Sequence, residues 1–222
     1  RDELDAALGK GFKRPGWQGR EPFLHARHNV VEYNDFHNVM QITGDGNTIY
    51  VSGCGTGNTI RRNWCHDNFG GYMNAVIRND DDQHGSIFDG NIVARSSGHG
   101  EGFINKGANT IVNNIVADLR PTHRHRSYLV LVRYDQTGAV HKGNIYYARR
   151  PGQVAISETK PNQRSPKGAL LKDVDSDRNV YFSEADPEWG TKVLGQFRPQ
   201  GVEKASQSGD PLFVDADQDD YR

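Results

Sequence analysis

Cysteine is scarce in this 222-residue chain, which limits both disulfide and metal chemistry. Cys54 and Cys65 are too few for a disulfide framework and lack the spacing of a metal site. A free cysteine packs as a small hydrophobic residue, so we expect buried or half-buried thiols. One disulfide could form if the protein is exported.

The chain also lacks an excess of either positive or negative charge, and it has no long apolar run. Lys and Arg number 27 against 28 Asp and Glu, a formal net charge of −1. The chain therefore has no electrostatic footprint of a nucleic-acid or anionic-membrane binder, and neither partner is expected. No run of about 18 apolar residues predicts a membrane span. The chain begins at Arg1 without Met or a signal peptide, so we expect a mature or truncated product.

Asparagine recurs in closely similar surroundings, which indicates an internal repeat. The aligned residues, at unequal intervals, are Asn34, Asn63, Asn91, Asn114, Asn144 and Asn179. Ankyrin and tetratricopeptide repeats keep a tight period and are helical, whereas the coils of a β-helix vary in length. A stacked column of buried amides can hydrogen-bond from coil to coil across about 4.8 Å, so these asparagines are predicted to be structural.

Short β-branched strands lie between the asparagine blocks, including TIYVSG, NAVIRND, EGFINKG, LVLVRYD and QVAISE. Because side chains alternate along a strand, alignment of the apolar centres predicts two inward columns. The first is Val51, Ile77, Ile104, Val132 and Ile156, and the second is Ile49, Ala75, Gly102, Val130 and Val154.

These repeats predict an all-β fold, a right-handed single-stranded parallel β-helix of about five to seven coils that could be a fragment of a longer helix. Residues 28–160 are expected to form the coils. Residues 1–27 are expected to be irregular or the remains of preceding coils, and residues 161–222 to hold the last coil and a loop-rich end. Neither end offers a convincing amphipathic cap.

The segments RHNVVEYNDFHNVMQITGDGNTIYVSG, NTIRRNWCHD, IRNDDDQHGSIFDGNIV and NTIVNNIVAD resemble a known family. They are similar to the secreted bacterial right-handed β-helix repeat proteins related to pectate lyases and β-helix glycoside hydrolases. The closing GDPLFVDADQDDYR is similar to the end of many such proteins. The resemblance implies a secreted or periplasmic protein that acts on a glycan, but the same architecture carries several activities, so function must be argued from the site.

The outward residues of the strands predict a carbohydrate groove. Aromatic rings lie against the faces of sugars, and charged groups bind hydroxyl or uronate groups. The predicted outward ladders are Tyr50, Val76, Phe103 and Leu131; Ser52, Arg78, Asn105 and Arg133; and Gly53, Asn79, Lys106, Tyr134 and Glu158. The substrate contacts expected from them are Tyr50, Arg78, Phe103, Asn105, Lys106 and Arg133, with His84 and His99 from neighbouring turns.

The acidic turn NDDDQHG predicts the reacting groups. Three consecutive carboxylates repel one another unless a cation neutralises one of them or one keeps its proton through a raised pKa. Asp80, Asp81 and Asp82 are therefore candidate catalytic residues. They could instead form a solvated turn or bind calcium. Asp135 lies two coils from Asp80 in the aligned register, at an expected 9–10 Å or so, and Glu101 is an alternative partner.

Three functions remain open at this point. A glycoside hydrolase would use paired carboxylates and would require no cofactor. A polysaccharide lyase would use a Lys or Arg base among Arg78, Lys106 and Arg133 to remove the proton next to a uronate carboxyl group, with calcium or cations to stabilise the charge. A non-catalytic β-helix would bind glycan without an acid pair. All three have a polysaccharide or oligosaccharide as partner.

Overall fold

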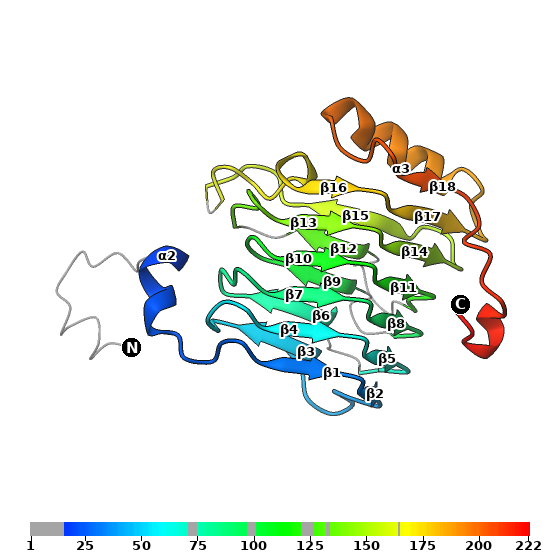
Figure 1. Ribbon diagram of the computed structural model, residues 1–222. Helices are drawn as coiled ribbons and strands as arrows, with labels where there is room; N and C mark the ends of the chain where they lie inside the picture. Colours follow the sequence, from blue (N-terminus) through cyan, green and yellow to red (C-terminus); the bar gives the residue numbers. More distant parts are fainter. Residues whose placement is uncertain (1–15, 71–74, 97–100, 121–126, 132–133, 164) are drawn as a thin grey trace.

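The structure is a computed structural model, which describes residues 16–70, 75–96, 101–120, 127–131, 134–163 and 165–222. Three parallel sheets stack into a β-solenoid of about six turns (Figure 1). Each of the first five turns of the chain contributes one short strand to each sheet. The predicted parallel solenoid is confirmed.

Sheet A contains β1 (Val30–Glu32), β4 (Thr59–Arg61), β7 (Ile87–Asp89), β10 (Thr110–Val112), β13 (Val140–Lys142) and β16 (Asp175–Asp177). Sheet B contains β2 (Asp35–His37), β5 (Trp64–His66), β8 (Ile92–Ala94), β11 (Ile115–Ala117), β14 (Ile145–Ala148), β17 (Val180–Ser183) and β18 (Gln207–Ser208). Sheet C contains β3 (Asn47–Ser52), β6 (Ala75–Asp80), β9 (Glu101–Asn105), β12 (Ser127–Leu131) and β15 (Val154–Glu158).

The asparagine ladder stands at the corner between sheets A and B, as predicted. From Asn34 to Asn144, each side-chain amide donates to the Oδ1 atom of the asparagine in the next coil, over N···O distances of 2.9 to 3.1 Å, and the amide of the last, Asn179, donates to Glu203. Asn91 Nδ2, for example, lies 3.0 Å from Asn114 Oδ1. The backbone N–H of the same residue donates to the same oxygen at 2.9 Å. The ladder therefore satisfies buried backbone groups at every sharp turn.

The predicted inward columns of sheet C are wrong in register. Val51 lies beside Asn79, Ile77 beside Phe103 and Ile104 beside Val130, so these apolar residues do not form one column. Pairing instead aligns Ile49, Ile77, Phe103, Leu129 and Ile156, all of which are buried in the core. Val132, of the predicted column, lies outside the described residues.

A break in strand alternation accounts for this error. In β9 two consecutive residues face the core: a Cβ atom on Gly102 would meet Cγ1 of Val116 at 2.6 Å, and the ring of Phe103 packs edge-on against Phe88 at 6.2 Å. Strict alternation, on which the alignment depended, therefore fails at this point. The strand leaves Glu101 before this pair and Ile104 after it on the outer side.

Five residues predicted to face outward consequently belong to the interior: Val76, Asn79, Phe103, Asn105 and Leu131. Val76, Phe103 and Leu131 are buried in the apolar core. Asn105 is buried as well, and its amide bridges the side chains of Asn79 and Gln136. Phe103 and Asn105 are thus parts of the core, and the prediction that they contact substrate is wrong.

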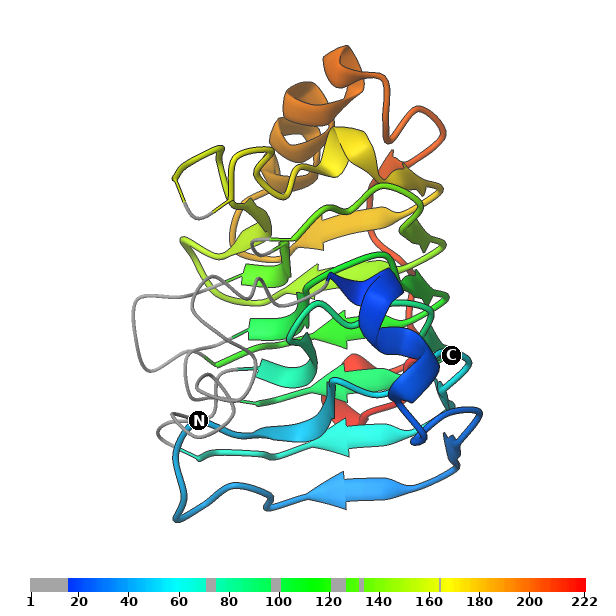
Figure 2. The ribbon, with the colours of Figure 1, turned by 90° about the vertical axis from the view of Figure 1, so that its left-hand side faces the viewer.

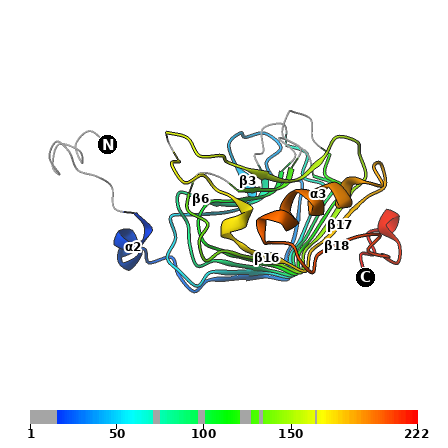
Figure 3. The ribbon, with the colours of Figure 1, turned by 90° about the horizontal axis from the view of Figure 1, so that it is seen from above.

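The C-terminal end of the solenoid is capped, contrary to expectation. Helix α3 (Trp189–Phe197) lies across the last coil (Figure 3), with Trp189, Val193, Leu194 and Phe197 buried beneath it. The indole Nε1 of Trp189 donates to the carbonyl of Gln153 at 2.7 Å. The apolar spacing of α3 is typical of an amphipathic helix, but the segment is only nine residues long and was interpreted as loop. The helix shields the open edge of the core.

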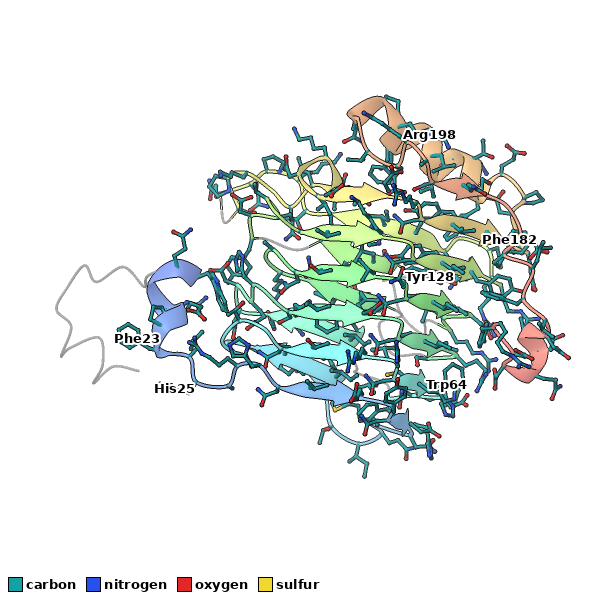
Figure 4. The ribbon with its side chains drawn as sticks, in the orientation of Figure 1. Phe23, His25, Trp64, Tyr128, Phe182 and Arg198 are labelled. Carbon is teal, nitrogen blue, oxygen red and sulfur yellow. The ribbon has the colours of Figure 1, made fainter. Side chains whose placement is uncertain are left out.

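Two further segments pack against the outside of the stack (Figures 1 and 2). Helix α2 (Trp17–Arg20) and the short η1 turn (Glu21–Phe23) lie beside the turns at one edge of sheet A. The C-terminal segment, with η4 (Ala216–Gln218), runs along sheet B on the side of Trp64 (Figure 4). The ring centroids of Tyr221 and Trp64 are 5.9 Å apart. The remaining short turns are η2 (Leu171–Asp173) and η3 (Arg198–Gln200). No helix in the described part of the chain is long and apolar enough to cross a membrane.

Candidate functional site

Asp80 is the centre of a charged cluster on the outer face of sheet C. It ends β6, is 4% exposed, and receives hydrogen bonds or ion pairs from Arg78 at 2.5 Å, from the Tyr50 hydroxyl at 2.7 Å and from Lys106. Its burial raises the pKa, but the hydrogen bonds from Lys106 and Tyr50 outweigh burial and hold the pKa of Asp80 below its ordinary value. Asp80 is therefore an ionised carboxylate.

Arg78 orders this cluster from the middle of β6. Its guanidinium carbon lies 5.4 Å from the centre of the Tyr50 ring, a cation–π contact, and its second ion pair is to the exposed Asp45 at 3.7 Å. The strand register places Arg78 between Tyr50 of β3 and Ile104 of β9. The predicted contacts Tyr50, Arg78 and Lys106 are thus brought together on one surface, although through pairings different from those expected.

Glu101 begins β9 and has the opposite protonation behaviour. It is 7% exposed, and burial raises its pKa to about 7, although the positive charge of Arg78 opposes the rise. A carboxyl group with this pKa keeps its proton well above the pH at which an ordinary carboxylic acid loses it. Two carboxyl groups whose environments move their pKa values apart are typical of an acid/base pair.

The strand register gives the relative positions of Asp80 and Glu101. Glu101 pairs with Ala75, whereas Asp80 lies five positions further along β6. At about 3.3 Å per residue their Cα atoms are roughly 16 Å apart along the sheet. Arg78 is ion-paired with Asp80, and its positive charge also acts on the pKa of Glu101.

The three acids of the turn diverge and do not act as one cluster. Asp81 is exposed and accepts a hydrogen bond from Ser52 at 3.1 Å. Asp82 points toward α2, where it accepts from the backbone N–H of Trp17 at 3.1 Å and pairs with Arg20 at 3.3 Å. Positive φ angles of 51° and 60° at Asp81 and Asp82 turn the backbone sharply between these directions.

The carboxylates of the turn at residues 80–82 are not arranged around a common metal position. Asp80, Asp81 and Asp82, for which calcium was considered, bind separate sets of protein donors. Among the described residues, no group of three or more His, Cys, Asp or Glu side chains is arranged to hold a metal ion.

The other predicted site residues lie in different places. Asp135 is paired with the exposed Lys167 at 2.7 Å and hydrogen-bonded to Thr137, and these contacts hold its pKa well below the usual range. It lines a pocket together with Asp82 and His84 and has no contact with Asp80. Arg133 and His99 lie outside the described residues.

Sequence reasoning missed Trp17 and Arg20, which fix Asp82. Both fall in a stretch that shows no strand register, and their contacts span 65 and 62 residues of sequence respectively. The only available signal was an aromatic residue beside glycines in PGWQGR, which is common in loops.

Comparisons of the chain with protein-family models, with curated proteins and with solved structures found no match. The arguments for function therefore rest on the geometry and electrostatics of this outer face.

Proposed function

We propose that this protein is a carbohydrate-active enzyme, a glycoside hydrolase that acts on a polysaccharide or oligosaccharide bound across the outer face of sheet C. The observation that carries the proposal is the pair Asp80 and Glu101. One carboxyl group is held ionised by two cations, and the other has a pKa of about 7. Hydrolysis of a glycosidic bond needs one protonated and one ionised carboxyl group.

Glu101 is the proton donor to the leaving oxygen in this proposal. Its raised pKa keeps a proton available near neutral pH, where an ordinary Glu would have lost it. Asp80 is the ionised partner that activates water or stabilises positive charge on the sugar ring. Arg78 and Tyr50 bind the sugar next to the reacting bond, the first through donors to its hydroxyl groups and the second through its half-exposed ring.

The spacing of the two acids does not fit a retaining mechanism. Retaining enzymes hold their carboxyl groups about 5–5.5 Å apart, whereas inverting enzymes hold them about 6.5–9.5 Å apart to admit water. A five-residue offset along neighbouring strands is too long for the retaining distance, even with both side chains leaning toward Arg78. We therefore expect no covalent glycosyl-enzyme intermediate on Asp80.

The lyase alternative has less support. A lyase base must be free to approach the substrate, but Lys106 is buried and ion-paired with Asp80. Arg78 is likewise ion-paired with Asp80. The resemblance of the repeat segments to secreted bacterial β-helix proteins supports a secreted or periplasmic location as part of the proposal.

The test is a panel of neutral and uronate-containing polysaccharides, with reducing ends and unsaturated products measured separately. Hydrolysis releases reducing ends without unsaturated products, and a lyase produces both. Glu101→Gln and Asp80→Asn should each lower turnover by about 10²–10⁴-fold. Glu32→Gln, which removes a carboxylate paired with Arg61 on sheet A, is the matched control and should keep the wild-type rate. Unsaturated products, or full activity in both site variants, would refute the hydrolase.

A further inference from the structure

A pocket of about 580 Å³ lies between α2 and the turns beside sheet C, separate from the Asp80 cluster. Its lining includes Trp17, Gln18, Asp82, His84, Asp135 and Thr137. The volume is within the range of about 300–1,000 Å³ that small-molecule sites have. The proposed chemistry at Asp80 and Glu101 makes no use of this pocket.

One wall of the pocket is held rigidly by His84. Its Nδ1 accepts the backbone N–H of Ala108 at 3.1 Å, so the proton is on Nε2, which donates to Asp82 at 2.8 Å. The ring stacks on Trp17 with centroids 5.2 Å apart. On its other side a Cβ atom at Gly107 would lie 2.9 Å from the ring, so only glycine allows this close approach. The aromatic wall therefore needs no reorganisation to receive a ligand.

The polar groups of the pocket are acceptors whose charges are already balanced. Asp82 pairs with Arg20, and Asp135 pairs with Lys167. An ionised carboxylate still has acceptor positions for hydroxyl groups, and the Thr137 hydroxyl, which donates to Asp135 at 2.6 Å, can still accept. An aromatic wall beside paired carboxylates suits a neutral, hydroxyl-rich ring better than an ammonium ion or a uronate.

We propose that this pocket is a subsite for a neutral sugar residue of the same glycan, an inference that rests on the proposed function. Asp82 is two residues from Asp80, so their Cα atoms are at most about 7 Å apart. A glycan that occupies the Asp80 cluster therefore reaches the pocket with its adjoining residues. The subsite restricts the substrate class to glycans with a neutral residue at this position.

The test measures binding separately from turnover. The Glu101→Gln protein is applied to an array of xylo-, manno-, gluco- and galacto-oligosaccharides and oligogalacturonides, and Kd is measured for each bound glycan. We expect binding to neutral oligosaccharides, a loss of about tenfold in affinity when Trp17→Ala is added, and a severalfold loss with Asp135→Asn. Asp135→Asn replaces an exposed side chain by one of the same shape and does not touch α2. It therefore tests the pocket even if Trp17→Ala disturbs the folding of α2. Phe23→Ala, an exposed aromatic residue of η1 outside the pocket, is the matched control and should bind as the parent does.

Equal affinity of the parent, Trp17→Ala and Asp135→Asn proteins would overturn the subsite, as would binding to no glycan or only to oligogalacturonides. The proposed function fails differently, through absence of hydrolysis by the wild-type protein. Trp17-dependent binding without any hydrolysis would leave the subsite standing and remove the hydrolase.

Discussion

At the scale of single residues, the carboxylate of Asp80 already has its acceptor positions occupied. Lys106 and the Asp81 N–H contact Oδ1, while Arg78 and the Tyr50 hydroxyl contact Oδ2. A water molecule can reach this carboxylate most easily by replacing Tyr50, which is 48% exposed, the most accessible of these donors. In the proposed mechanism, Tyr50 must therefore release its hydrogen bond to Asp80 during turnover.

The first prediction follows from this arrangement. Tyr50→Phe should keep kcat within about tenfold of the wild type, because the ring remains and the lost hydroxyl is the donor that water replaces at Asp80. Asp80→Asn should reduce kcat by about 10²–10⁴-fold. Steady-state kinetics on the substrate found in the panel measure both. A Tyr50→Phe protein as inactive as Asp80→Asn would contradict the role given to Tyr50.

A second prediction concerns His141, a histidine buried inside the solenoid. It hydrogen-bonds to Ser176 at 2.7 Å and to Tyr146, and burial lowers its pKa to about 4. Since the folded pKa lies below the unfolded value of 6.5, the unfolded chain binds the proton first. The stabilisation is complete above pH 6.5 or so and decreases as the pH falls toward 4, by at most about 1.4 kcal/mol per pH unit.

Urea unfolding of the wild type and of His141→Asn across this pH range measures the effect. The difference in unfolding free energy between the two proteins should shrink as the pH falls, because only the wild type has this histidine to protonate. The comparison also cancels the opposite contribution of Glu101, whose raised pKa makes its stabilisation decline between about pH 4.5 and 7. A difference that stays constant with pH would contradict a neutral buried His141.

At the scale of elements, the asparagine ladder supplies a third prediction. Asn114→Ala should lower the unfolding free energy by about 1–3 kcal/mol, because it leaves buried partners in two neighbouring coils unsatisfied. Asn34, in the first coil, is exposed, and Asn34→Ala should cost less because water can replace its hydrogen bonds. Urea midpoints of the two variants test this, and equal losses would show that burial does not set the strength of the ladder.

The cap helix gives the fourth prediction. Phe197→Ala should destabilise the protein by about 3–5 kcal/mol, because the ring is 1% exposed and its removal leaves a cavity between α3 and the last coil. Gln196→Ala, on the exposed side of the same helix, should change stability by less than about 0.5 kcal/mol. Thermal or urea unfolding distinguishes them, and a harmless Phe197→Ala would mean that α3 does not protect the core.

These elements differ in how far the sequence predicted them. The asparagine ladder was predicted residue by residue, because a single polar residue type recurs at one sharp turn and leaves a visible pattern. Register in sheet C was wrong because Gly102 and Phe103 both face inward, which a rule of strict alternation cannot anticipate. Arg78, Lys106 and Asp80 still lie together, since charged side chains of neighbouring coils reach one another across a small register error.

At the scale of the whole molecule, the solenoid holds the proposed reacting groups on stacked strands. Tyr50, Asp80 and Glu101 come from three successive coils, so their separations depend on strand stacking and little on loop conformation. The partnership of α2 with Asp82 was not predictable, because it joins segments more than 60 residues apart without a repeated pattern. The same stack buries Glu101, which is the origin of its raised pKa.

The pH dependence of kcat/KM tests the account most directly, because it reports the proton that Glu101 is proposed to donate. On the substrate found in the panel, the wild type should lose activity with rising pH through an apparent pKa near 7. Glu101→Gln should be slower by about 10²–10⁴-fold and should lack this alkaline limb. A Glu101→Gln protein with the wild-type rate and the same alkaline limb would contradict the assignment of Glu101 as the catalytic acid.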